Sequence, residues 1–266
     1  LDDNSRFLSE IDKGAVQLQN TYGDLKLDLA YKQNPDAIFS LGMRQSIAGV
    51  SDAYSLHADS YFSGINQAKV ANVVNSGNID AAIGLVSGYT DRQAQHGIAG
   101  VNTSVLIRPN NQLSLRLGLG YLQEQETFLS NYFSGAYQTG DARTKALNLT
   151  TTTQLNHDWN LIAQYNKGNT QVDSLRDSAV SEISAIDSES YALSLVGRGI
   201  YNKDDTLFTA VKQPMKINNG QMTLDIASGL NLDDSVNFTK HTLDLKPSGS
   251  EKTLTIGYLS PYGKNG

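Results

Sequence analysis

The chain has 266 residues, a net charge of −6 and no cysteine. Without cysteine, disulfides and thiolate chemistry are excluded, and the acidic balance argues against a nucleic-acid partner, which needs a basic face. No run of 18 or more apolar residues is present, so the sequence predicts no transmembrane helix. A negative mean hydropathy does not exclude a membrane barrel, because such a barrel exposes only alternate residues to lipid.

The first 78 residues are less regular than the rest of the chain. Alternating leucines predict a hairpin within residues 16–36. Residues 37–45 and 53–62 are candidates for two further strands, while 65–76 is apolar enough for a short helix or a covered loop. We therefore separate an N-terminal junction with the first strands, residues 1–78, from a body that covers residues 79–266.

From residue 79 onward, apolar and polar residues alternate with a period of two, which is typical of half-buried strands. The segment 112–125 is the clearest, since four leucines and Tyr121 point one way while Ser114, Arg116 and two glycines point the other. The turn residues of 109–111 precede it. The same pattern predicts strands at 79–91, 97–108, 142–155, 159–172, 188–202, 206–216 and 252–260, with a polar excursion at 217–251.

The connections between these strands alternate between short and long from residue 97 onward. A membrane barrel with short turns at one end and long loops at the other keeps this order, and strands of about ten residues suit a tilted membrane crossing. The predicted fold class is all-β, an antiparallel up-and-down transmembrane β-barrel of about 10–12 strands. A large soluble β-sandwich or solenoid, in which the alternation separates core from water, is the alternative.

The two faces of the predicted barrel carry different residues. Tyrosines near strand ends fit aromatic girdles at the membrane surfaces, namely Tyr89, Tyr121, Tyr191, Tyr201 and Tyr258. The residues predicted to face the lumen are Ser114, Arg116, Asn160, Gln164, Ser194 and Arg198. The residues predicted to face lipid are Leu113, Leu115, Leu117, Leu119, Leu193 and Leu195.

Three segments resemble a known family in their order and spacing. The first comprises Glu126, Thr127, Phe128, Leu129, Ser130, Gly135, Ala136 and Tyr137. The second comprises Gln213, Pro214, Met215, Lys216, Ile217 and Gly220, and the third Leu245, Pro247, Ser248, Gly249, Leu254, Ile256 and Tyr258. Together they resemble the translocator β-barrel of subtilase-type autotransporters, which perform type V secretion. The resemblance covers roughly residues 79 to 260.

This resemblance implies a non-enzymatic domain of the bacterial outer membrane or cell surface. Such a domain anchors and exports its own N-terminal passenger, often a subtilisin-like protease, and its partners are outer-membrane lipid and the outer-membrane barrel assembly machinery. The family's barrels have about twelve strands, and this chain stops where a last hairpin is expected. Either the first and last strands close a smaller barrel, or the native gene continues by about 25 residues, two strands and a turn.

No catalytic, cofactor or metal site is predicted. The four histidines, His57, His96, His157 and His241, lack metal-ligand spacing and are expected in solvated loops. Two other function classes stay open. One is a soluble extracellular all-β structural protein that assembles by edge-strand addition, and the other is a small porin, which would not need the export motifs.

Overall fold

A single rolled sheet dominates the computed structural model, which describes residues 16–33, 58, 60–62, 65–75, 79–89, 96–203 and 205–260. Within these residues, eleven strands form one antiparallel sheet in which each strand neighbours the next barrel strand along the chain. The strands of this sheet are β1 (Val16–Tyr22), β2 (Leu25–Gln33), β3 (Asn66–Asn75), β4 (Ile79–Tyr89), β5 (Gly97–Asn110), β6 (Leu113–Glu124), β9 (Ala142–Gln154), β10 (Trp159–Val172), β12 (Ile186–Arg198), β13 (Thr206–Asn219) and β16 (Thr253–Leu259). The predicted all-β, up-and-down antiparallel architecture is confirmed.

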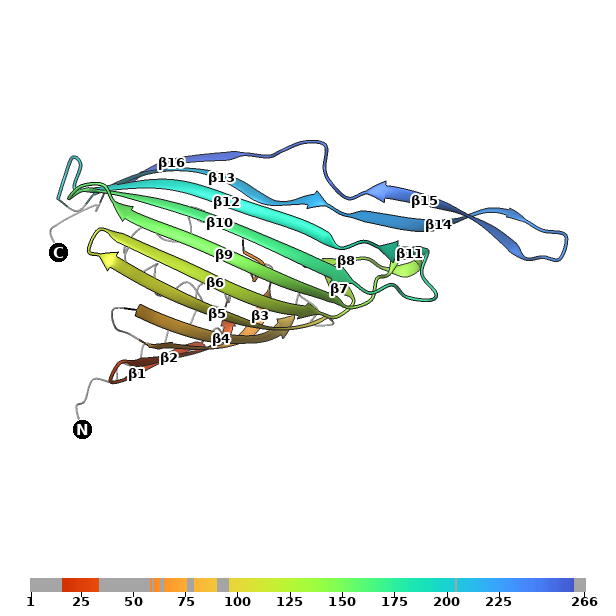
Figure 1. Cartoon of the computed structure of the whole chain (residues 1–266), viewed down its shortest axis with the longest axis horizontal. Coiled ribbons are helices and arrows are strands. Elements are labelled where there is room, and N and C mark those ends of the chain that lie inside the picture. Colours follow the sequence, from red (N-terminus) through yellow and green to blue (C-terminus); the bar gives the residue numbers. More distant parts are fainter. Residues whose placement is uncertain are drawn as a thin grey trace.

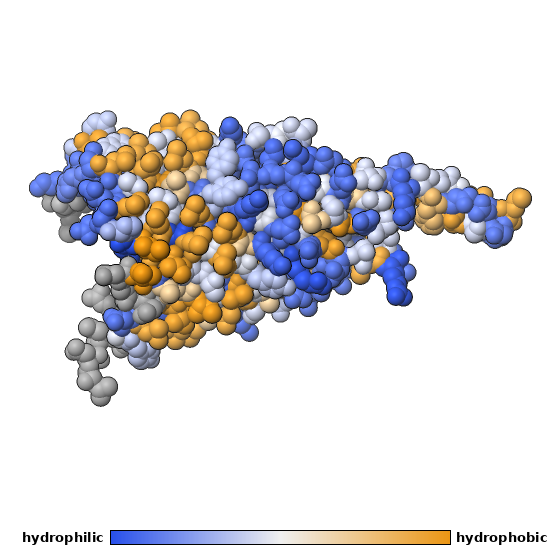
Figure 2. Space-filling view, viewed as in Figure 1, coloured by the Kyte–Doolittle hydropathy of each residue, from blue (hydrophilic) through white to orange (hydrophobic). Residues whose placement is uncertain are grey.

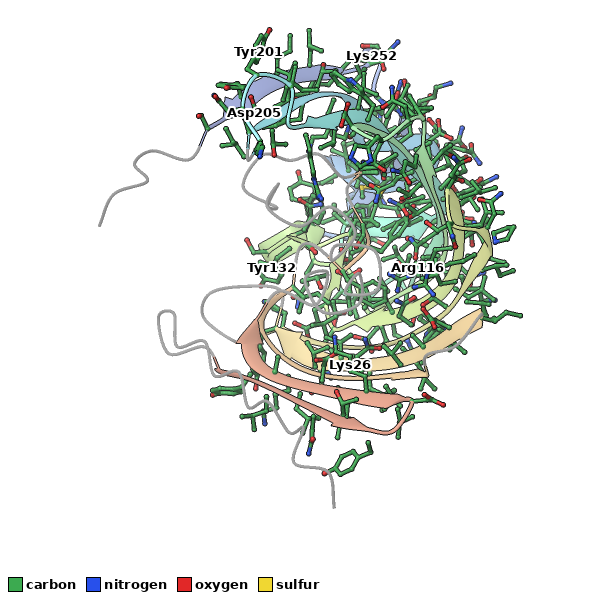
Figure 3. All side chains as sticks on the ribbon, turned by 90° about the vertical axis from the view of Figure 1, so that its left-hand side faces the viewer. Lys26, Arg116, Tyr132, Tyr201, Asp205 and Lys252 are labelled. Carbon is green, nitrogen blue, oxygen red and sulfur yellow. The ribbon has the colours of Figure 1, made fainter. Side chains whose placement is uncertain are left out.

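The sheet curves strongly, and Figure 3 shows it end-on as an incomplete ring with β1 and β16 at its two edges. Eleven antiparallel strands place both described edges in the same direction, so direct pairing of β1 with β16 would be parallel. A closed ring that is antiparallel throughout would need an odd number of additional strands in the gap between β1 and β16. Residues 261–266, where the last hairpin is expected to begin, lie outside the described residues.

The connections differ at the two ends of the sheet. The links β5–β6, β9–β10 and β12–β13 are short and lie at the left-hand end in Figure 1. The links β6–β9, β10–β12 and β13–β16 at the opposite end are long and form additional structure. This consists of β7 (Thr127–Phe128), β8 (Asn131–Tyr132), a 3₁₀ turn at Gly135–Tyr137, β11 (Val180–Ile183), β14 (Gln221–Leu230) and β15 (Val236–Asp244).

The strands β11, β14 and β15 form a second, three-stranded sheet. Beyond β11, the β14–β15 hairpin projects from the body along the long axis of the molecule (Figure 1). The expectation of a polar excursion over 217–251 was therefore wrong in its central part. β15 and the second half of β14 are exposed on both faces, and such strands need no apolar alternation. The first half of β14 buries Met222 and Leu224.

The N-terminal predictions have mixed outcomes. The hairpin within residues 16–36 is confirmed as β1 and β2, which pair from Val16–Tyr31 to Tyr22–Leu25. The short helix or covered loop expected at 65–76 is wrong, because a valine-rich segment there forms β3 between β2 and β4. Of the candidate strand 53–62, the described residues are not in a strand, and the candidate at 37–45 lies outside the described residues.

The turn between β5 and β6 differs slightly from the predicted one. The predicted turn over 109–111 is displaced, since Pro109 and Asn110 still belong to β5 and the turn follows at Asn111 and Gln112. Asn110 Oδ1 accepts the backbone N–H groups of Gln112 and Leu113, which fixes this tight reversal.

Among the described residues, no helix is long and apolar enough to span a membrane. The boundary between residues 78 and 79 stays a prediction, and β1–β3 continue the same sheet.

Side-chain burial in the rolled sheet alternates along each strand. Figure 2 shows apolar residues spread over the outside of the half that carries the short turns, while hydrophilic residues dominate the other half of the body. Buried apolar side chains gather in three separate clusters. They are Ala30, Phe62, Ile65, Val70, Val86, Ile98 and Leu122; then Ile162, Val196, Phe208 and Ala210; and then Phe128, Ala142, Val172, Val180, Ile186, Met222 and Leu224. We call the third set the rim cluster.

Candidate functional site

The concave face of the sheet carries the six residues that were predicted to face a lumen. Arg116 points into the ring in Figure 3. Strand alternation places Ser114 on its face, and the register joins Arg116 through Thr150 to Gln164. The same register connects Ser114 to Ser194 through Thr152 and Ile162, with Asn160 and Arg198 on the same side. The structure therefore brings the six onto one wall, and the lumen itself stays a prediction.

The six leucines predicted to face lipid all lie on the opposite, convex face. Leu117 and Leu119 are 50% and 58% exposed, and Leu193 is 51% exposed. Leu113, Leu115 and Leu195 are half-buried. Other large apolar side chains extend this exposed face across the sheet, among them Leu29, Ile79, Ile83, Leu85, Val105, Ile107, Leu147, Leu149, Val211, Leu254 and Ile256.

Hydrogen bonds between neighbouring strands link the polar side chains of the concave wall. Arg116 Nη2 donates to Ser104 Oγ at 2.9 Å. A second ladder crosses three strands, in which Asn148 Nδ2 donates to Asn166 Oδ1 at 2.7 Å and Asn166 Nδ2 donates to Ser190 Oγ at 3.2 Å. These neutral amide and hydroxyl groups therefore satisfy one another across neighbouring strands of the wall.

A segment between β2 and β3 packs against the inside of this wall. Tyr61 Oη donates to the Ser188 carbonyl at 2.9 Å, and Ala58 N donates to Gln164 Oε1 at 2.7 Å. Phe62 is buried in the first apolar cluster. Ala58, Tyr61 and Phe62 therefore occupy part of the space inside the ring. Sequence reasoning missed this insertion.

Two wall glycines make room for the inserted aromatic rings. A Cβ at Gly168 would collide with the Tyr61 ring, and a Cβ at Gly120 would lie 3.1 Å from Phe62 Cε2. The side chain that fills the gained space was not foreseen, because it lies more than 50 residues away along the chain.

A polar hollow of about 800 Å³ opens at the short-turn end of the wall. Three of the predicted lumen residues, Ser114, Asn160 and Arg198, contribute to it together with Arg108 and His157. Arg108 Nη1 lies 2.6 Å from Asp80 Oδ2, so its charge is partly compensated at this mouth. The hollow is continuous with solvent and is lined by polar groups.

The turn between β12 and β13 is organised by the buried carboxylate of Asp205. Its oxygens accept the backbone N–H groups of Ile200, Tyr201 and Asn202 at 2.7–2.9 Å and the Tyr258 hydroxyl at 2.9 Å. Burial alone would raise the pKa of Asp205, but these four donors outweigh it and hold the pKa below its usual value. Asp205 thereby connects this turn to the last described strand.

The opposite end of the sheet is the long-loop rim, where a strained loop follows β6. Glu126, Leu129 and Ser130 have φ values of 52°, 49° and 62°, a backbone region that residues other than glycine rarely adopt. The buried carboxylate of Glu124 accepts the backbone N–H groups of Leu129 and Ser130 at 3.0 and 2.8 Å. These bonds fix the unusual conformation of the loop.

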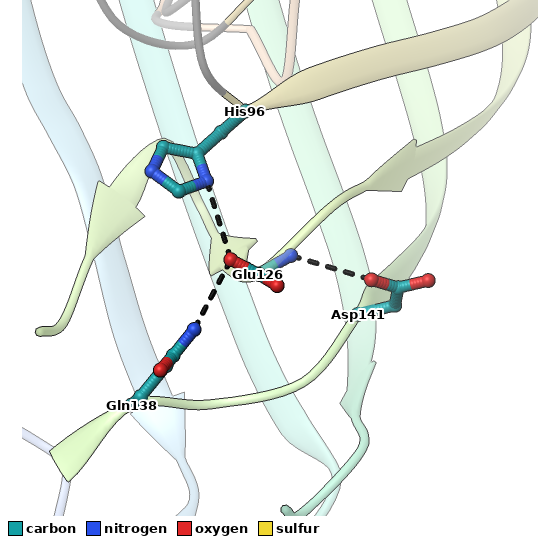
Figure 4. A network of polar contacts seen from close by, with 4 residues as sticks. All are labelled: His96, Glu126, Gln138 and Asp141. Atoms are coloured by element: carbon teal, nitrogen blue, oxygen red, sulfur yellow. Dashed lines mark hydrogen bonds and ion pairs between the residues drawn. The ribbon is translucent and has the colours of Figure 1, made fainter. Parts of the chain in front are cut away.

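Figure 4 shows a polar network around Glu126 in this loop. Its Oε2 accepts from Gln138 Nε2 at 3.1 Å and lies 3.7 Å from His96 Nδ1, while its backbone N–H donates to Asp141 Oδ1 at 3.3 Å. His96 is buried and stacks on Tyr132 with ring centroids 4.1 Å apart. The expectation that every histidine is solvated is therefore wrong for His96.

Parts of the three family-like segments meet at this rim, the third segment only through its first residue, Leu245. Phe128 belongs to the rim cluster, and Leu129, Ile217 and Leu245 pack against it. Leu245 N donates to the Gly220 carbonyl at 2.9 Å, which joins the second segment to the third. Sequence reasoning found the segments but could not place them together.

The histidines and carboxylates of the described residues are dispersed over the molecule. No group of three or more histidines and carboxylates in the described ranges could hold a metal ion. His157 and His241 are exposed, as expected, and His57 lies outside the described residues.

Comparison with known proteins gives a likeness to a solved structure. No family model and no curated protein matches the chain. The anion-selective porin from Comamonas acidovorans is similar in structure, with 12% sequence identity and a TM-score of 0.49. The match covers 92% of this chain and 58% of the porin, so the chain spans little more than half of that protein's length.

Proposed function

We propose that the chain is a β-barrel of the bacterial outer membrane, with lipid against its convex face and water against its concave face. The sidedness of the rolled sheet carries this proposal. Leu117 and Leu193 are about half exposed on the outside, whereas Asp28, Asn72 and Asn166 are buried on the inside. A soluble sheet would bury the leucines instead, because large exposed apolar surfaces are rare on soluble monomers. A membrane barrel has apolar residues outside and polar residues inside.

Aromatic residues at both ends of the apolar surface support the same proposal. Tyr201 and Tyr258 form an edge-to-face pair at the short-turn end, with ring centroids 5.9 Å apart. Tyr89 and Tyr121 lie toward the long-loop ends of β4 and β6 and are partly exposed. Tyrosine is favoured at membrane–water boundaries because its ring is apolar and its hydroxyl is polar.

The finer proposal is that this barrel is an autotransporter translocator, which exports an N-terminal passenger and performs no chemistry itself. The family-like segments support it, since each contributes at least one residue to the rim, namely Phe128, Ile217 and Leu245. The wall also suits such a role, because neutral side chains such as Asn148 and Asn166 bond one another and leave little to hold a passing polypeptide. The partners would be outer-membrane lipid, the passenger and the barrel assembly machinery.

A small porin is the second candidate, and the inserted segment favours it. Tyr61 and Phe62 narrow the space inside the ring and are anchored to the wall. A narrowed lumen suits passage of small solutes better than passage of a polypeptide. In the translocator, this segment would have to leave the lumen during export.

Membrane insertion is tested by expression with a signal peptide in a Gram-negative host, followed by membrane fractionation. We expect the chain in the outer-membrane fraction, dispersed only by detergent and migrating faster on gels when unheated. Monodisperse purification without detergent would contradict the proposal and favour the soluble structural protein.

Export is tested by fusing a reporter peptide to the N-terminus and measuring its accessibility to external protease on intact cells. Exposure of the reporter supports the translocator. The matched measurement is single-channel conductance of the purified barrel in a planar bilayer, compared with a Tyr61→Ala variant. Steady conductance that rises in the variant, with the reporter retained inside the cell, would support the porin instead.

A further inference from the structure

The convex face carries two adjoining hollows over the first strands of the sheet. The first, of about 470 Å³, is apolar and is lined chiefly by Leu18, Leu29, Tyr31, Ala71 and Leu85. The second, of about 490 Å³, is more polar and includes Tyr89, Gly97, Ala99, Gln123 and Gln125. Lys69 and Ser87 line both hollows and join them.

The register shows why the surface is indented there. Ala71 lies between Leu29 and Leu85 in one cross-strand row, so a small side chain is flanked by two large ones. In the next row, Lys69 is followed by Ser87 and Ala99, which are also small. Small side chains between larger neighbours leave space on a close-packed surface.

These two rows also mark a change in polarity along the strands. The row of Leu85 continues through Val101 to Tyr121 and is apolar, whereas the row of Lys69 continues to Gln123. The hollows therefore straddle the boundary at which the apolar surface ends on the long-loop side. Such a boundary is where the acyl chains of a bilayer give way to headgroups.

The charge of the site is positive in a chain whose net charge is −6. Neither hollow has an aspartate or glutamate among the described residues that line it. Lys69 is exposed and forms no ion pair with any described residue. An ammonium group beside an apolar hollow is complementary to an amphiphile with an anionic head.

The two hollows together form one groove. We propose that this groove binds a phosphate-bearing membrane lipid, with an acyl chain against Leu18, Leu29 and Leu85 and the phosphate beside Lys69. The proposal rests on the proposed membrane location. It commits to a lipid rather than to free phosphate, because the apolar side chains of the first hollow would contribute nothing to the binding of an inorganic anion.

The test uses the whole chain in nanodiscs and native mass spectrometry. The probes are phosphatidic acid and diacylglycerol with identical acyl chains, and inorganic phosphate as a competitor. We expect phosphatidic acid to be retained in preference to diacylglycerol and Lys69→Gln to weaken its binding by about fivefold, since one lysine near a headgroup contributes modestly. Ala71→Leu fills the apolar hollow and is expected to weaken binding of both lipids.

Two matched variants separate the groove from general surface effects. Lys145→Gln removes an exposed cation from the convex face, and Ala163→Leu enlarges a small residue on that face, both outside the groove. Neither is expected to change lipid retention. Equal retention of the two lipids, an equal loss in Lys145→Gln, or displacement of phosphatidic acid by inorganic phosphate would each overturn the lipid site. A chain that cannot enter nanodiscs would instead overturn the membrane location, and the lipid site with it.

Discussion

The rolled sheet and the rim cluster use the same strand alternation to bury opposite kinds of residue. In β6, Leu117 and Leu119 are exposed on the convex face, while the alternate residues lie on the concave wall. At the rim, Phe128 and Ile186 are buried against apolar neighbours, as in a soluble protein. The difference shows that alternation fixes which residues share a face, whereas the surroundings decide which face is covered.

The largest expected effect comes from the rim cluster, where the protein supplies its own apolar surroundings. Replacing Phe128, which is 4% exposed, by alanine removes a buried ring. We expect a loss of roughly 3–5 kcal/mol in the stability of the rim. Limited proteolysis within residues 126–137 and 173–185 measures this, because these connections pack around the cluster.

Phe238→Ala is the matched control for this change. Phe238 is 62% exposed on the projecting hairpin, so its loss leaves no cavity. Unchanged proteolysis in Phe238→Ala and faster proteolysis in Phe128→Ala are expected. Equal resistance in both variants would show that the rim is not held by this cluster.

The convex face should respond to charge rather than to cavities. Leu117→Arg places a cation on the surface that we assign to lipid and is expected to cost roughly 2–4 kcal/mol at the bilayer midplane. Ser114→Arg introduces the same side chain on the concave face of the same strand, beside the polar hollow, and is expected to be tolerated. Heat-modifiable mobility on gels measures assembly. Similar mobility of the two variants would reverse or remove the assigned facing.

The short-turn end is expected to show a smaller, pH-dependent effect through Asp205. Because its pKa in the folded protein is below the usual aspartate value, the ionised carboxylate stabilises the fold above that usual value. This contribution is lost as the pH falls from about 4 through the lowered pKa. In Asp205→Asn, acid unfolding should lose this part of its pH dependence, as followed by tryptophan fluorescence of Trp159.

The matched variant for the acid titration is Asp177→Asn, which changes an exposed carboxylate in a long connection. It should unfold with the pH dependence of the parent chain. An identical acid transition in Asp205→Asn and the parent would mean that the four hydrogen bonds to Asp205 do not stabilise its charge.

Strand positions in the body were largely predictable from sequence because one face of each strand differs so clearly from the other. The predicted strand 159–172 coincides with β10, and 206–216 lies within β13. β3 was missed because its valines and alanines occur on both faces. β15 was missed because exposure on both faces removes the constraint that creates a pattern. In β14 the alternating Met222, Leu224 and Ile226 were overlooked.

The candidate site was predictable only in part, for a related reason. The period of two was enough to assign Arg116 and Gln164 to one wall, since facing is a local property. The packing of Tyr61 against Gly168 joins residues more than 100 positions apart, and no local pattern encodes such a contact. The position of Glu124 beneath the strained loop is also a product of tertiary structure.

The smallest expected effect lies at the tip of the projecting hairpin. Leu230 is 67% exposed there, whereas Leu224, six residues earlier on the same strand, is 9% exposed in the rim cluster. Leu230→Ala should therefore change the stability of the chain by less than about 0.5 kcal/mol. Leu224→Ala should cost about 2–5 kcal/mol in the rim, because it leaves a cavity. Denaturant unfolding, monitored by the susceptibility of the hairpin to protease, measures the stability change in both variants. A large loss in Leu230→Ala would mean that the tip is covered in the folded protein and that the rim is not the only apolar contact of the hairpin.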